Sequence, residues 1–482
     1  MEIHQSAYSL KETASQAIDA GDLNQALHLI HDFVELIFTD PLCTAHVFGS
    51  KDLDDLCQRI GKINLIDLKQ KNVAEEFSSD VQPFFVYIVT RIQNSGGHNR
   101  VIQEFINAQP EAQHVILSTE LAGRSAADYF LTECKTRTNI ALKLPPKGNY
   151  QQRLTWLQRC LLEINPKKVY LFNHHQDSVA VAALQPEMEI DGSFYHHGDH
   201  HFCLGVYLSH LEHIDPNPAG YHNCRNELGI KNTYVPLTIE DKGPRPATLP
   251  FLHDDILTTC TAARSNKVEI PYFVSYLDLI PKLLQATGGK HIHIGRLTPW
   301  ARYRINRSLK LYNIKPDRFI YSPWVPSIWK ALHQYKVDLY IASFPYGGGL
   351  TLIEAFGAGI PVAIHKHIFS RILSCIDLGY PNAFNWRRPE ELLSFCTTVT
   401  ADQLNDMSKF ARRQFEQFHS SQHLSQFLNG EGNASLKPNL LAQRFTIDAD
   451  EWALWVTRQS SFKQLIYRLF YRAFRLLRAR LK

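Results

Sequence analysis

Residues 344–362 read FPYGGGLTLIEAFGAGIPV, a glycine turn followed by a helix-like run and a second apolar segment. The segment before it, Val337–Ser343, is apolar enough to form a buried parallel strand. The run after the turn should form a helix that begins near Leu350 and closes at Gly357. A strand, a turn, a helix and a further strand in this order predict a βαβ unit of a parallel sheet.

Three successive glycines let the backbone approach a ligand more closely than any residue with a Cβ atom could. A helix that begins near Leu350 would also point its first N–H groups at this space, where a diphosphate is favoured. Glu354 lies one turn into that helix, where its carboxylate can accept hydrogen bonds from ribose hydroxyls. An ordinary βαβ turn is the alternative, because a glycine run alone is weak evidence. The candidate binding residues here are Gly347, Gly348, Gly349, Leu350, Thr351 and Glu354.

In this stretch the chain resembles the donor-binding half of GT-B glycosyltransferases. Gly-Gly-Gly-Leu-Thr-Leu-Ile-Glu-Ala, followed by Ala-Gly-Ile-Pro-Val, is similar to the two-glutamate motif of the large retaining family. Glu354 matches the second, ribose-binding glutamate, but the position of the first holds Tyr346. The Phe-Pro-Tyr lead-in is closer to the Pro-Tyr-Gly-Gly-Gly-x-Thr segment of the inverting O-GlcNAc-transferase-like family. The resemblance is good over residues 255–420 and leaves the stereochemical outcome open.

This resemblance implies an α/β protein with two Rossmann-like, doubly wound domains. A chain of 482 residues, 44% of them hydrophobic, is too long for one core and fits two or three domains. The expected division is a helical segment over 1–80, an acceptor domain over 81–245, a donor domain over 251–440 and a helical tail over 441–482. Asp241–Pro250, with three prolines and a glycine, is the expected linker.

Strand and helix patterns alternate along both halves, which predicts parallel sheets. The expected strands are Phe84–Thr90, His114–Ser118, Lys168–Phe172, Tyr234–Leu237, Ile256–Thr259, His291–Ile294, Arg318–Tyr321, Val337–Ser343 and Pro361–Ile364. The expected helices are Leu10–Ala20, Leu23–Phe38, Asp52–Ile60, Asn99–Asn107, Gln151–Ile164, Tyr272–Ala286 and Arg302–Tyr312. Ligands of such sheets lie beyond the carboxyl ends of the strands, so the turn at Gly96 and Gly97 and the glycine turn should face one cleft.

Arg264 and Lys267 follow the strand expected over Ile256–Thr259. GT-B enzymes commonly place an Arg/Lys pair on the donor diphosphate at this point. The resemblance therefore implies that these two cations stabilise charge that grows on the leaving group. Side chains that only solvate a loop are the alternative. Pro323 and Val325 follow another strand, where relatives often hold the nucleotide base.

Residues 194–202 read FYHHGDHHF and hold four of the 23 histidines. In the acceptor domain of a GT-B enzyme this loop would line the cleft, where a histidine or Asp199 takes the acceptor proton or binds the donor phosphate. His98, beside the Gly96-Gly97 turn, is a further candidate base, and for any one histidine a structural role is the alternative. The catalytic candidates are His98, His196, His197, Asp199 and His200.

Asp199-His200-His201 and Gly96-Gly97-His98 also resemble the two signatures of DHH-type metal-dependent phosphoesterases. Histidine and aspartate clusters do bind divalent metals. In that family, however, the Asp-His-His element comes first, whereas here it comes second, and the further aspartate motifs of a two-metal site are not evident. His174 to Asp177 adds ligand-type residues, although a helix N-cap role explains Asp177 as well. The glycosyltransferase interpretation is preferred because it also uses the glycine turn.

The end of the chain predicts a membrane-binding helix. Apolar residues between Phe462 and Leu481 recur with the spacing of one helix face, and residues 461–482 hold seven basic and no acidic side chains. Such a helix suits an anionic membrane surface, and a terminal helix packed on the domain is the alternative. Without this tail the chain has no excess of positive charge, so nucleic-acid binding is not expected.

The sequence shows no sign of export or of a membrane span. No apolar stretch approaches the roughly 20 residues that cross a bilayer, and the first residues lack a signal-peptide pattern. The nine cysteines include no Cys-x-x-Cys pair and indicate reduced thiols. We therefore expect a cytoplasmic protein attached peripherally to the inner face of the plasma membrane.

Together these patterns predict a glycosyltransferase of the hexosyl or N-acetylhexosaminyl type. It would transfer a sugar from a nucleotide-sugar donor to a glycan or lipid-linked acceptor in surface polysaccharide assembly. One alternative is a protein O- or N-glycosyltransferase of the O-GlcNAc-transferase-like kind, recruited by the amino-terminal helices. The other is a non-catalytic glycan-binding scaffold. No cofactor and no metal are expected, and the donor, the acceptor and the anomeric outcome stay open.

Overall fold

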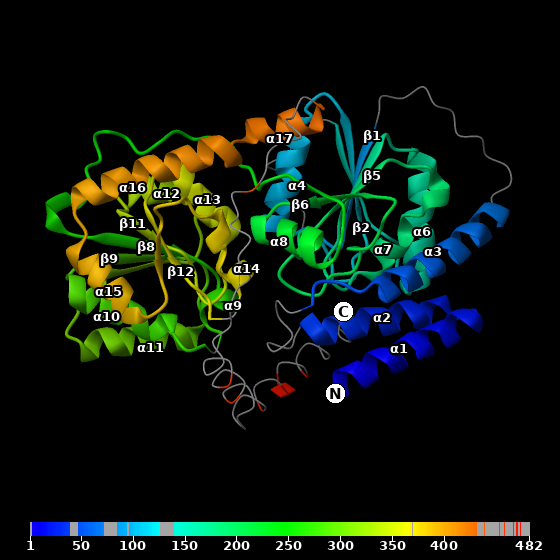
Figure 1. Cartoon of the computed structure of the whole chain (residues 1–482), viewed down its shortest axis with the longest axis horizontal. Coiled ribbons are helices and arrows are strands. Elements are labelled where there is room, and N and C mark those ends of the chain that lie inside the picture. Colours follow the sequence, from blue (N-terminus) through cyan, green and yellow to red (C-terminus); the bar gives the residue numbers. More distant parts are fainter. Residues whose placement is uncertain are drawn as a thin grey trace.

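Two parallel β-sheets, each flanked by helices, form the body of the protein (Figure 1). The computed structural model describes residues 2–38, 47–71, 84–93, 96–125, 139–270, 272–368 and 370–430, and single residues beyond them. Every strand pair in these residues is parallel. The predicted α/β fold with two doubly wound sheets is therefore confirmed, whereas the exact domain boundaries remain predictions.

The first sheet has seven strands, and their interior positions are almost all buried because helices cover both faces. From edge to edge they are β3 (Ile140–Lys143), β2 (Gln113–Ser118), β1 (Phe84–Val89), β4 (Lys168–Phe172), β5 (Gly192–Tyr195), β6 (Glu212–Asp215) and β7 (Asn232–Tyr234). Its helices are α4 (Gly97–Ala108), α6 (Tyr150–Ile164), α7 (Ser178–Ala183) and α8 (Pro218–His222).

Three amino-terminal helices pack onto this sheet. They are α1 (Glu2–Asp19), α2 (Leu23–Phe38) and α3 (Lys51–Lys71). The last is longer than predicted, because Leu65 and Leu68 are buried as well. Gly61 lets α3 approach α7 closely, since a Cβ atom there would lie 1.8 Å from the carbonyl oxygen of Ala182. The apolar faces of all three helices join one core with α6 and α7, so they cover the first sheet.

The second sheet has six strands and contains the glycine turn. From edge to edge they are β10 (Phe319–Ser322), β9 (Lys290–Ile294), β8 (Thr258–Ala262), β11 (Leu339–Ile341), β12 (Val362–His365) and β13 (Phe384–Trp386). Its helices are α9 (Ser265–Val268), α10 (Tyr276–Thr287), α11 (Pro299–Leu311), α12 (Ile328–Gln334), α13 (Gly349–Gly357), α14 (Arg371–Ser374), α15 (Pro389–Thr398) and α16 (Ala401–Gln414).

The chain crosses between the two sheets twice, and the crossings lie side by side. The N–H of Ile239 donates to the carbonyl of His419 (2.9 Å), and the N–H of Ser421 donates to the carbonyl of Ile239 (3.1 Å). After the second crossing, α17 (Ser421–Leu428) packs against α4 and buries Leu424 in the core of the first sheet (Figure 1). The carboxyl-terminal helix of the second half thus belongs to the first body.

The predicted linker, Asp241–Pro250, forms no helix or strand but is anchored to the second body. A guanidinium nitrogen of Arg245 donates to the carbonyl of Val337 (2.6 Å), and the same side chain pairs with Asp338 (3.5 Å). Asp241 pairs with Arg412 on α16. Asp241 and Arg245 therefore fix the connecting segment to the body of the second sheet.

Several predicted elements are displaced. The strand predicted over Tyr234–Leu237 ends at Tyr234, because the next residue but one, Pro236, has no N–H for the ladder. The strand predicted from Ile256 begins at Thr258, after a 3₁₀ turn over His253–Asp255. The helix predicted from Tyr272 begins at Tyr276, since the Tyr272 hydroxyl is engaged with His365 and the N–H of Ile368. Strands β3, β5, β6 and β13, each of three or four residues, were not predicted.

The basic tail predicted to bind membranes lies outside the described residues, apart from single exposed positions such as Leu469 and Phe470. Within the described ranges, no helix combines the length and the apolar character needed to cross a bilayer.

Candidate functional site

The glycine turn connects β11 to α13, and the helix begins at Gly349 as predicted. A Cβ atom on Gly347 would lie 2.8 Å from Cys375 Sγ, and one on Gly348 would lie 2.6 Å from Thr351 Oγ1. Glycine is therefore required for packing at both positions. No side chain caps α13, so its first N–H groups are available to a ligand. An uncapped helix start with glycines on one side is a favourable place for an anion.

Lys267 lies on α9, directly after β8, and reaches this turn. Its ammonium group donates to the carbonyl oxygen of Gly347, and a Cβ atom on Gly348 would lie 3.5 Å from the nitrogen. Burial lowers the pKa of Lys267, and in the described part of the chain no carboxylate forms an ion pair with it. A half-buried cation held only by a backbone carbonyl beside a helix N-terminus favours a bound anion.

The other predicted donor residues surround the turn less closely. Arg264 is exposed and directly precedes α9, whereas Lys267, on that helix, contacts the turn. Pro323 is exposed and Val325 is half-buried, and both follow β10 at the carboxyl edge of the second sheet. Leu350 and Thr351 form the first turn of α13, where the Tyr340 hydroxyl donates to Thr351 Oγ1 (3.0 Å).

Glu354 has a structural partner that the sequence did not indicate. The N–H of Trp329, in the first turn of α12, donates to Glu354 Oε2 (2.9 Å). Burial raises the pKa of Glu354, and the backbone N–H groups of Trp329 and Ile328 counteract this effect. The Glu354 carboxylate therefore caps the start of α12, and its role toward a ribose stays a prediction.

Replacing Glu354 with alanine should weaken nucleoside-diphosphate binding by about 1–3 kcal/mol, because a hydrogen-bond acceptor is lost. The variant should also unfold at a lower temperature, because α12 loses a cap worth about 0.5–2 kcal/mol. Isothermal titration and thermal unfolding separate the two effects. The Glu354→Gln variant is the control, since its amide oxygen retains an acceptor. Unchanged affinity in Glu354→Ala beside lowered stability would restrict Glu354 to the capping role.

Three histidines meet at the carboxyl edge of the first sheet. His98 follows β1, His174 follows β4 and His197 follows β5, and these strands are neighbours. The ring centroids of His98 and His197 are 4.4 Å apart, and those of His98 and His174 are 5.5 Å apart. Both ring nitrogens of His98 are buried and have no hydrogen-bond partner among the described residues. We call these three residues the histidine cluster.

Burial, and then the neighbouring rings of His197 and His174, lower the pKa of His98 well below its usual range. Burial likewise lowers the pKa of His174 to about 4 and that of His197 to about 3. The rings are therefore neutral near pH 7. A neutral histidine with an unoccupied ring nitrogen can accept a proton from an incoming hydroxyl.

The histidine cluster lies next to the glycine turn of the other sheet. Gly97 is in contact with the start of α13, since a Cβ atom on it would lie 3.2 Å from Leu350 Cδ1. Gly96, one residue earlier, has a φ of 147°, which favours glycine. The structure thus brings the predicted turn at Gly96 and Gly97, with His98 directly after it, against the predicted donor turn.

The remaining candidates make their described contacts with residues outside the histidine cluster. His196 is buried and bonds to Asp215, as described below. His200 packs against His175 and His201 instead of His98, and its Nδ1 is 3.5 Å from Asp199 Oδ1. Asp199 is buried, and a Cβ atom on Gly220 of α8 would lie 2.8 Å from its Oδ2.

The phosphoesterase interpretation gains no support, because the group of described residues that could hold a metal ion contains neither His98 nor the Asp199-His200-His201 segment. Asp177, in contrast, has the predicted role: its Oδ1 accepts from the N–H of Ala180 (2.9 Å) and caps α7.

The sequence did not single out His174 as a partner of His98, nor His213, Asp215 and Cys224 as partners of His196. The only signal for the last group is the His-x-Asp spacing at 213 and 215, which puts both side chains on one face of a strand.

No family model and no curated protein matches this chain. Solved structures resemble it in fold. Alr3699/HepE from Anabaena, in complex with UDP-glucose, superposes with a TM-score of 0.55 and 11% identity over 72% of this chain and 98% of that chain. The lipopolysaccharide outer core galactosyltransferase WaaB gives a TM-score of 0.50 with 13% identity over 72% of this chain and 99% of that chain. The chain has the GT-B fold of glycosyltransferases.

Proposed function

We propose that the protein is a glycosyltransferase that moves a sugar from a nucleotide-sugar donor to a glycan or lipid-linked acceptor. The observation that carries this proposal is the position of Lys267 at the glycine turn, with Gly97, which directly precedes His98, packed against the start of α13. The complex of Alr3699/HepE with UDP-glucose supports a nucleotide-sugar as the ligand of such a fold.

In the proposed reaction, the bond between the anomeric carbon and the diphosphate oxygen breaks, and the acceptor oxygen forms the new bond to that carbon. Negative charge grows on the leaving diphosphate, where Lys267 and the first N–H groups of α13 stabilise it. The acceptor hydroxyl loses its proton to His98, whose ring nitrogens have no partner in the described part of the chain. The products are the glycosylated acceptor and a nucleoside diphosphate.

Surface polysaccharide assembly and attachment to the inner face of the plasma membrane belong to the proposal too. Their support is the basic amphipathic pattern of residues 461–482. A protein glycosyltransferase is the second candidate, although the packing of α1 to α3 on the first sheet already gives those helices a structural role.

A donor panel tests the proposal directly. The full chain is incubated with UDP-, GDP- and dTDP-sugars, and the released nucleoside diphosphate is measured with and without lipid and peptide acceptors. We expect release from a restricted set of donors that increases with a suitable acceptor. Tight binding of a nucleoside diphosphate without any turnover would favour the scaffold alternative, and absence of both would contradict the proposal.

A further inference from the structure

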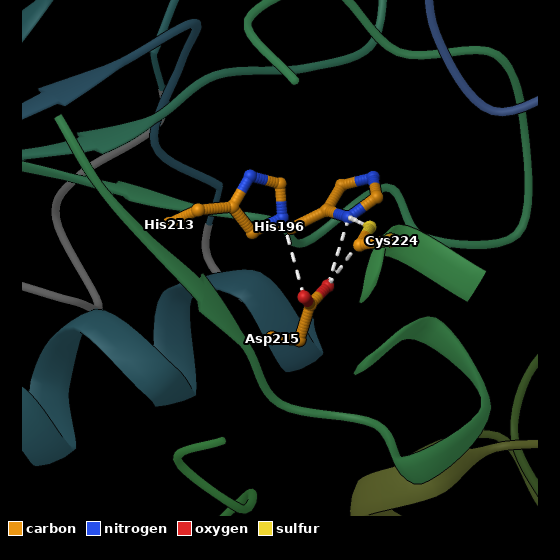
Figure 2. A group of neighbouring side chains, drawn as sticks. All are labelled: His196, His213, Asp215 and Cys224. Carbon is orange, nitrogen blue, oxygen red and sulfur yellow. Dashed lines mark hydrogen bonds and ion pairs between the residues drawn. The ribbon is translucent and has the colours of Figure 1, made fainter. Parts of the chain in front are cut away.

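Four buried side chains with metal-ligating atoms converge on and next to strands β5 and β6 (Figure 2). They are His196, His213, Asp215 and Cys224, which are at most 4% exposed. One nitrogen, oxygen or sulfur atom from each lies within 4.8 Å of the others. Figure 2 shows the two rings and the thiol directed at the Asp215 carboxylate.

The group is built on rigid elements. His213 and Asp215 are two residues apart on β6, so their side chains leave the same face of the strand. His196 directly follows β5, whose Tyr195 pairs with Ile214 of β6. Cys224 lies in the π-helical segment Asn223–Glu227, which directly follows α8. Its thiol is the fourth member of the group.

The separations suit a tetrahedral ion. Asp215 Oδ1 lies 2.9 Å from His196 Nδ1 and 3.6 Å from Cys224 Sγ, and Asp215 Oδ2 lies 3.3 Å from His213 Nε2. Cys224 Sγ is 3.3 Å from His196 Nδ1. Ligands at zinc bond lengths of about 2.0–2.3 Å stand about 3.3–3.8 Å apart in a tetrahedron. Three of these four separations lie in that range, the contact between Asp215 and His196 is shorter, and the remaining pairs lie within 4.8 Å.

The surrounding hydrogen bonds orient two of the ligands. His213 Nδ1 lies 3.3 Å from the carbonyl oxygen of Val206, which can only accept, so Nδ1 donates this hydrogen bond and fixes the ring. The opposite nitrogen, Nε2, is thereby directed at Asp215 Oδ2. Asn232 donates to the same carboxylate (2.6 Å). Outer hydrogen bonds of this kind are typical of metal ligands.

We propose that His196, His213, Asp215 and Cys224 bind a structural Zn²⁺ ion. Imidazole nitrogen, carboxylate oxygen and one thiolate together are a ligand set that zinc accepts, and four protein ligands leave no open position for substrate. On binding, the Cys224 thiol releases its proton to solvent, and the thiolate and carboxylate balance the charge of the ion. The site is independent of the proposed function and departs from the expectation, drawn from the sequence, that no metal is bound.

Metal analysis of the full chain tests the site. Protein purified without chelating resin should contain about one zinc per chain, and the chelator-treated apoprotein should unfold at a lower temperature that Zn²⁺ restores and Mg²⁺ does not. The Cys224→Ser and His213→Gln variants should lose the zinc. Cys203→Ser is the matched control, because Cys203 is equally buried nearby but is outside the group.

Cobalt provides a readout that does not depend on the variants folding. Apoprotein titrated with Co²⁺ should develop visible bands of a tetrahedral ion and a near-ultraviolet thiolate-to-cobalt band. Folded apoprotein that binds neither Zn²⁺ nor Co²⁺ would overturn the proposal, as would zinc content that is unchanged in both Cys224→Ser and His213→Gln.

Discussion

Replacing Lys267 with methionine should lower kcat/KM for the preferred donor by about 10²–10³-fold. Methionine has a similar length but no charge, so the leaving diphosphate loses the cation that contacts the glycine turn at Gly347. Initial rates of nucleoside-diphosphate release measure the effect, and titration with the nucleoside diphosphate shows how much of it is lost binding. Lys267→Arg should retain part of the activity, because the charge remains.

The matched control for this prediction is Lys330→Met, which removes an exposed lysine from α12. It should leave turnover and diphosphate affinity unchanged. If Lys267→Met also kept both, with the protein folded, the glycine turn would not be the diphosphate site.

Replacing His98 with glutamine should lower kcat by about 10²–10⁴-fold while donor affinity stays the same, because a general base is lost and the donor pocket is not. The wild-type pH profile provides a second readout. A base acts only when unprotonated, so kcat/KM should fall as the pH drops through the pKa of His98. Since burial holds that pKa well below the usual 6.5, the acid limb should lie below pH 6.5 and be absent from the variant.

His423→Gln is the control for His98, since His423 lies on α17 and its Nε2 is engaged with the carbonyl of Glu416 (2.9 Å). Its rate and pH profile should match those of the wild type. A normal kcat in the His98→Gln protein would contradict this prediction and indicate that another group, such as Asp199, acts as the base.

The donor half was predictable from the sequence because its signals are local. The strand Val337–Ser343, the glycines and the start of α13 follow one another, and each has its own sequence signature. Strand β11 is shorter than predicted, but the turn is where the pattern placed it. The bond from Glu354 to Trp329 was not predictable, since it depends on how α12 packs against α13.

The acceptor half was predictable only in part because its site forms from separate segments. The sequence identified His98 and His197 individually, yet their contact with each other and with His174 depends on the strand order β1-β4-β5. Strand β6 was not predicted, because two of its four residues, Glu212 and Asp215, are acidic. The partners of His196 on this strand were therefore missed. Adjacent residues His196 and His197 consequently serve different groups.

The paired crossings at Ile239 and Ser421 have a mechanical consequence. A single flexible linker would let the two bodies swivel in any direction. Two segments joined by backbone hydrogen bonds should resist twisting of one body relative to the other. The two bodies should therefore bend mainly about a single axis. If the two bodies move apart at Gly97 and Leu350, they should return along the same path. Each closure should then restore the same position of His98 relative to Lys267.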